Sequence, residues 1–132
     1  MSEPFMEHPS GEFETCLAAL ASAVTRLRAL PKWEEWIIFG AQGEGARPES
    51  YHFAEIRMLG DTLDVGEAPL DIAKILKKAQ AGNASLEPQG SHYVLTASPK
   101  ECARILDAIF RHHLGIRPFA DEGDDYAVGA EW

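Results

Sequence analysis

The hydrophobic residues of this chain recur at two different spacings, which divide it into helices and strands. From Glu12 to Leu30 the spacing is three or four residues, at Phe13, Leu17, Leu20, Val24 and Leu27. This spacing places one apolar stripe along an α-helix. We therefore predict a first helix over Glu12–Leu30, with Ser10 as its N-cap and Pro31 as its stop.

Three segments after this helix are rich in β-branched and aromatic residues, a composition typical of strands. They are Trp33–Phe39, Tyr51–Leu59 and Thr62–Val65. We interpret Gly40–Pro48 as a flexible loop and not as a phosphate-binding loop. It leads into another strand rather than a helix, and it lacks the Gly-Lys-Ser/Thr ending. Gly60-Asp61 predicts a tight type II′ turn between the last two strands.

The second half of the chain predicts two more helices and two or three more strands. One helix is expected from Pro69 to Ala81, ended by Gly82 and with three lysines on its outer face. The sequence Ser98-Pro99-Lys100-Glu101 is a capping signal for another helix, Pro99–Leu114. The expected strands are Ser85–Glu87, His92–Ala97 and, as a short final element, Tyr126–Trp132.

These elements predict one α+β domain over residues 1–132, with residues 1–11 as a flexible acidic N-terminus. Their order is α-β-β-β-α-β-β-α-(β). We expect an antiparallel sheet of about five or six strands packed against three helices.

The net charge of −9 is concentrated at the two ends of the chain. Residues 17–120 carry equal numbers of acidic and basic side chains, whereas neither end segment contains a base. Chain termini often lie close together, so both ends could form one acidic patch or remain solvated tails. The candidate partner-binding residues of this patch are Glu12, Glu14, Asp121, Glu122, Asp124 and Asp125. No basic stripe is present, which argues against nucleic acid as a partner.

The same sequence argues against a membrane location and predicts a cytoplasmic one. No apolar run is long enough to cross a bilayer, and Met1–Glu7 has no signal-peptide pattern. The two cysteines, Cys16 and Cys102, lie on apolar helix stripes, which indicates reduced core thiols, although a disulfide between the helices is the alternative.

A search for catalytic or cofactor chemistry leaves one weak candidate. Cys102 would sit in the first turn of its helix, where the dipole favours a thiolate, with His113 or His92 as a base. No zinc spacing joins the five histidines, although His52 and His92 could be adjacent in the sheet. We expect no metal and no cofactor.

The predicted order of elements, from the helix Glu12–Leu30 to the helix Pro99–Leu114, resembles that of type III secretion chaperones and YbjN-like domains. Those are small acidic cytosolic α+β proteins. The resemblance implies a homodimer whose exposed apolar faces hold an unfolded segment of a client protein. The segment Tyr126–Trp132 departs from that order.

The sequence therefore favours a protein-binding module, chaperone-like, in which the terminal Trp132 marks a contact surface. One alternative is an immunity protein, whose acidic patch would neutralise a basic toxin. A second alternative is a small cysteine-dependent enzyme that uses Cys102.

Overall fold

The computed structural model describes residues 4–8, 16–28, 37–44, 51–59, 61–66, 69–117 and 127–131. Its helices are α1 (Cys16–Arg28), α2 (Ile72–Ala79) and α3 (Pro99–His112). Its strands are β1 (Pro4–His8), β2 (Ile37–Glu44), β3 (Tyr51–Leu59), β4 (Thr62–Asp64), β5 (Ser85–Gln89), β6 (His92–Thr96) and β7 (Ala127–Glu131).

The strands form one sheet whose order is β1-β7-β2-β3-β4-β6-β5, and every neighbouring pair is antiparallel. The predicted fold class is confirmed: an α+β fold with an antiparallel sheet, three helices among the described residues, and, from α1 to β7, the element order read from the sequence. The sheet has seven strands, because β1 adds one that the sequence did not predict. The predicted final strand is confirmed as β7.

The N-terminal strand β1 differs from the prediction that residues 1–11 are flexible. It pairs with β7, which places Glu7 opposite Gly129 and His8 opposite Val128. Five residues without an apolar alternation give no strand signal of their own. Without β1, strand β7 would be the edge of the sheet, with unpaired backbone N–H and C=O groups. The backbone of residues 4–8 pairs with these groups and so forms a strand.

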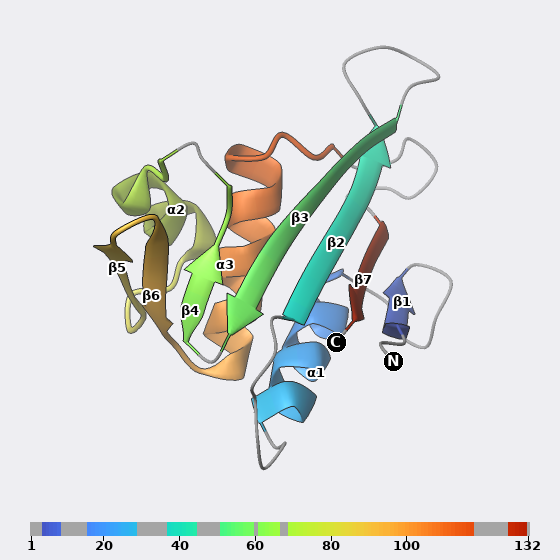
Figure 1. Ribbon diagram of the computed structural model, residues 1–132, viewed down its shortest axis with the longest axis horizontal. Coiled ribbons are helices and arrows are strands. Elements are labelled where there is room, and N and C mark those ends of the chain that lie inside the picture. The colour runs from blue at the N-terminus through green and yellow to red at the C-terminus, as the bar shows by residue number, and fades with distance from the viewer. Residues whose placement is uncertain are drawn as a thin grey trace.

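The helices cover one face of the sheet. In Figure 1, α1 and α3 lie behind β2, β3 and β4, and α2 packs against α3. Side chains on a strand alternate between the two faces. In β3, Ile56 and Met58 are therefore buried toward the helices, whereas Glu55 and Arg57 are exposed on the other side. No helix of the described part of the chain lies on that other side, which we call the open face.

Large side chains from both layers fill the space between sheet and helices. The fully buried ones include Leu20 of α1, Ile75 of α2 and Ile105 and Phe110 of α3, which meet Phe39, Ile56, Leu63 and Leu95 of the strands. Burial of one such side chain contributes about 1.5–3 kcal/mol. This single core holds the sheet in place and leaves the open face without a packing role.

The start of α3 confirms the predicted capping signal. Ser98 is the N-cap, and its hydroxyl oxygen accepts a hydrogen bond from the amide of Glu101 at 3.2 Å. The same hydroxyl donates to the Glu101 carboxylate, also at 3.2 Å, and Pro99 occupies the first helical position. At the other end the helix stops at His112, two residues before the predicted end, and Gly115 then turns the chain with φ +76°.

The predicted start of α2 is wrong, because Pro69 does not open this helix. Asp71 is the N-cap instead, and its carboxylate accepts a hydrogen bond from the amide of Lys74 at 3.2 Å. Leu70 donates its amide to the hydroxyl of Tyr93 at 2.8 Å, in a buried bond. Pro69 and Leu70 therefore belong to the connection between β4 and α2, which is tied to β6.

The predicted stop of α2 is also displaced. Gln80 takes the left-handed conformation at the C-cap, with φ 54°, where the sequence pointed to Gly82. Its amide donates to the carbonyls of Leu76 and Lys77, so the last turn is closed before Gly82 is reached. The predicted outward placement of the lysines is confirmed, since all three are exposed.

The glycine-rich segment after Phe39 is a strand as far as Glu44, so the predicted loop over Gly40–Pro48 is wrong for this part. Gly43 is buried, and a Cβ atom on it would overlap the carbonyl oxygen of Arg117. It would also lie 3.0 Å from Cγ2 of Ile116. Gly43 thus lets β2 pass close to the segment that follows α3, a contact that only the fold reveals.

Smaller differences affect the ends of three strands. β4 ends at Asp64 and β6 at Thr96, each one residue earlier than predicted. β5 continues to Gln89, two residues beyond its predicted end at Glu87, and includes Pro88. β5 is the outer strand of the sheet, where a missing amide donor does not interrupt the ladder.

Candidate functional site on the open face

The open face carries a row of charged side chains across three neighbouring strands. Arg57 of β3 lies opposite Asp64 of β4 in the strand register. The pairing of Leu63 with Tyr93 then places Asp64 next to His92 of β6. The residues of this row come from separate parts of the sequence, and the sheet brings them together.

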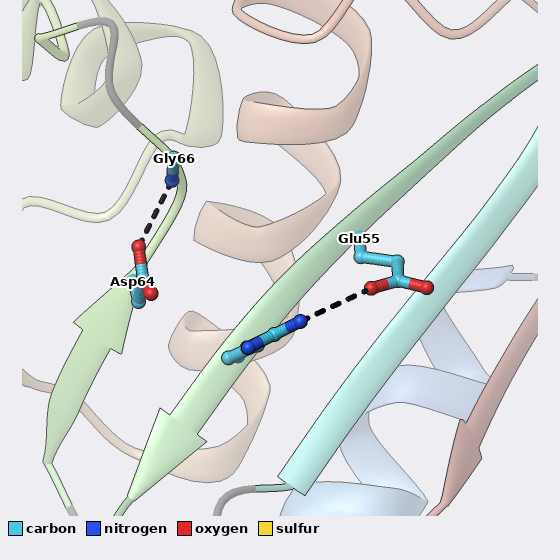
Figure 2. Close-up of polar contacts among 4 residues, drawn as sticks. Glu55, Asp64 and Gly66 are labelled. Atoms are coloured by element: carbon cyan, nitrogen blue, oxygen red, sulfur yellow. Dashed lines mark hydrogen bonds and ion pairs between the residues drawn. The ribbon is translucent and has the colours of Figure 1, made fainter.

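Two ion pairs connect the row. Nε2 of His92 lies 3.8 Å from Oδ2 of Asp64, and Nη2 of Arg57 lies 3.9 Å from Oε2 of Glu55. Figure 2 shows the second of these, with the Glu55 carboxylate extending from β3 toward β2. The four side chains are between 31% and 54% exposed. Pairs this exposed contribute about 0.2–1 kcal/mol, so the charges do little to stabilise the fold.

Asp64 has a second role, in the turn that follows β4. Its Oδ1 accepts a hydrogen bond from the amide of Gly66 at 3.0 Å (Figure 2). Gly66 has φ +97°, a conformation that other residues rarely adopt. This bond holds the carboxylate in one orientation, so that its other oxygen faces His92.

A hollow of about 350 Å³ opens beside this carboxylate. Its walls come from the end of β4, the connection to α2 and the turn between β5 and β6, and its polar groups include Asp64, Ser91 and His92. A carboxylate, a hydroxyl and an imidazole at one place can bind the backbone or side-chain groups of another molecule.

The hollow does not have the spacing of an acid–base relay. A general base and its orienting carboxylate are normally about 2.6–3.2 Å apart, and His92 and Asp64 are 3.8 Å apart. At this distance the two side chains do not share a hydrogen bond.

Apolar side chains flank the charged row. Ile38 of β2, Leu59 of β3 and Val94 of β6 point to the open face and are partly exposed. Thr62 lies opposite Val94 and next to Leu59 in the strand register. The open face thus combines charges that can orient a partner with apolar side chains that gain from being covered.

The residues that the sequence proposed for partner binding lie outside the described residues. These are Glu12, Glu14, Asp121, Glu122, Asp124, Asp125 and Trp132. One premise of the acidic patch is nevertheless confirmed. The two ends of the chain come together, because β1 and β7 are neighbouring strands (Figure 1).

The pairing proposed for a cysteine-dependent enzyme is not present. Cys102 is a buried thiol with 0% exposure, on the side of α3 that faces the core. His92 lies on the open face, with the sheet between them. His113 lies eleven residues further along the chain, about 16 Å along a helix axis.

The two histidines that the sequence placed together as metal-ligand candidates lie on strands that are not neighbours. The proposed neighbourhood of His52 and His92 is wrong, because β4 separates β3 from β6. Within the described residues, no group of three His, Cys, Asp or Glu side chains is arranged to hold a metal ion.

The contact between His92 and Asp64 could not be predicted from the sequence. The two residues are 28 positions apart, and only the register of β4 against β6 joins them. The alternation of buried and exposed residues does indicate that both side chains lie on the open face, because Asp64 follows the buried Leu63 and His92 precedes the buried Tyr93.

No protein family, no curated protein and no solved structure matches this chain. In the part of the chain that the structure describes, no helix is both long and apolar enough to span a membrane.

Proposed function

We propose that this protein is a small protein-binding module, chaperone-like, that holds a segment of a partner protein on the open face of its sheet. The observation that carries the proposal is the uneven use of the two faces. One face is sealed by helices, and the other presents Arg57, Asp64 and His92 among partly exposed apolar side chains.

The composition of the open face fits a protein segment better than a small polar ligand. Ile38, Leu59 and Val94 belong to three strands, are partly exposed, and lie outside the hollow beside Asp64. An extended or helical segment could cover these side chains while its polar groups meet the charged row.

The resemblance to type III secretion chaperones extends the proposal to a homodimer in the cytoplasm. A reducing compartment fits Cys102, which is buried as a thiol. An immunity protein that neutralises a basic toxin is the rival within the same class, and it requires the acidic chain ends instead of the open face.

Site-specific photo-crosslinking in the native cell extract tests the proposal. A benzoylphenylalanine in place of Val94 puts the reactive group on the open face. The same group in place of Thr25 puts it on the exposed side of α1. We expect a discrete crosslinked protein from position 94 and none of the same mass from position 25.

The salt dependence of that crosslink separates the two binding roles. A product that persists at about 0.5 M salt supports an apolar client on the open face, because salt screens charges and strengthens apolar burial. A basic partner that is lost at that salt concentration favours neutralisation by the acidic ends. The absence of any product specific to position 94 would contradict the proposed use of the open face.

A further inference from the structure

A group of lysines on α2 lies away from the open face and has a different character. Lys74, Lys77 and Lys78 are all exposed, on a chain whose net charge is −9. Among the described residues, no acidic side chain forms an ion pair with any of them. With Asp71, Ala73 and Gln80 they border a shallow hollow on the helix surface.

The dipole of α2 accounts for the positions of two of these three lysines. Lys77 and Lys78 lie in the last turn of α2, where a positive charge favourably meets the helix dipole. Lys74 lies outside that turn. It is four residues before Lys78, so the two Cβ atoms are about 5–6 Å apart on one face. Two like charges at this spacing destabilise a helix by about 0.2–0.5 kcal/mol. Asp71 borders the same hollow, but its carboxylate accepts a hydrogen bond from the amide of Lys74 and forms no ion pair with either lysine among the described contacts.

The charges of Lys74 and Lys78 also act on the end of α3. The pKa of His112 is lowered, first by partial burial and then by the positive charges of Lys78 and Lys74. Arg111 lowers this pKa further, and Asp107 opposes the shift. Asp107 is itself paired with Arg111, at 2.9 Å. Positive potential therefore accumulates where the ends of α2 and α3 meet.

We propose that Lys74 and Lys78, on the exposed surface of α2, form a binding site for an acidic segment of a partner protein. Carboxylates four residues apart on a helix repeat at the same spacing as the two lysines, so one helical turn can meet both. A nucleic acid fits less well. Its phosphates continue far beyond three lysines and would meet a chain with an excess of acids. This site is independent of the open face.

A nuclear magnetic resonance titration of the His112 ring tests the proposal at the site itself. Two synthetic helical peptides are compared, one with Glu residues four positions apart and one with Gln in their place. An acidic peptide bound here stabilises the imidazolium, so the pKa of His112 should rise with the Glu peptide and not with the Gln peptide.

Variants connect that shift to the lysines. The double variant Lys74→Gln/Lys78→Gln should bind the Glu peptide about tenfold more weakly at low salt, since two exposed ion pairs are lost. Lys100→Gln is the matched control. Lys100 is also exposed but lies at the start of α3, about 18 Å from His112 along the helix axis, so its loss should leave binding unchanged.

Three results would overturn the proposal. One is equal binding of the Glu and Gln peptides. A second is an oligonucleotide of the same charge that binds as tightly, with the same dependence on Lys74 and Lys78. The third is a shift of His112 on concentrating the protein without peptide, which would assign the site to a second copy of this chain.

Discussion

The two faces of the sheet are built from the same strands but differ in how far their side chains are buried. Ile56 and Arg57 are neighbours in β3, yet Ile56 is 0% exposed whereas the Arg57 side chain is 54% exposed. On β6, Tyr93 is buried and bonded to the connection before α2, and the next residue, Val94, is on the open face. The fold depends on the first face, and this leaves the second available for binding.

Truncating one buried and one exposed side chain should give the largest difference in unfolding free energy between the two faces. Ile56→Ala removes a fully buried side chain from the core, so we expect the free energy of unfolding to fall by about 2–5 kcal/mol. Arg57→Ala should change it by about 0.5 kcal/mol or less, because the ion pair with Glu55 is long and exposed. Urea unfolding followed by circular dichroism measures both.

These two variants are matched by position, since they differ by one residue on the same strand. Similar losses from Ile56→Ala and Arg57→Ala would mean that a structure covers the open face in solution. The face would then be part of the core and not a binding surface.

Backbone packing on the helix-covered side gives the next prediction. Gly43→Ala places a methyl group against the carbonyl of Arg117, and the segment after α3 must move away. We expect a loss of about 1–3 kcal/mol in unfolding free energy, as for overpacked cores.

Gly82→Ala serves as the control, because nothing lies within 4 Å of a Cβ atom at that position. It should leave the thermal unfolding midpoint nearly unchanged. A Gly43→Ala variant as stable as the Gly82→Ala variant would show that β2 does not pass Arg117 so closely.

The sequence predicted those features that depend on residues close together in the chain. The start of α3 was predicted correctly because Ser98, Pro99 and Glu101 together form a local capping signal. The boundaries of β3 were also correct. The start of α2 was wrong because Asp71 and Pro69 are both plausible first-turn residues. A long-range bond from Leu70 to Tyr93 decides between them.

Features that depend on distant contacts could not be predicted in this way. Gly43 has the appearance of a loop glycine, and its role comes from Arg117, 74 positions later. The contact between Asp64 and His92 requires knowing that β4 pairs with β6. Alternation alone assigned the faces of the strands, but it could not give their order in the sheet.

Apart from the control variants at Arg57 and Gly82, the smallest expected effect on stability is at Asp64, whose carboxylate both shapes a turn and belongs to the charged row. Asp64→Ala removes the bond to the Gly66 amide and the pairing with His92, both partly exposed, so we expect a loss of about 0.5–1.5 kcal/mol. Asp64→Asn keeps an acceptor for Gly66 and should lose less. Both variants should reduce the crosslink formed from position 94, because both remove the charge from the row. If Asp64→Asn leaves the crosslink unchanged while Asp64→Ala weakens it, the carboxylate only shapes the turn. The apolar side chains of the open face would then bind the partner, and the charged row would not contribute to binding.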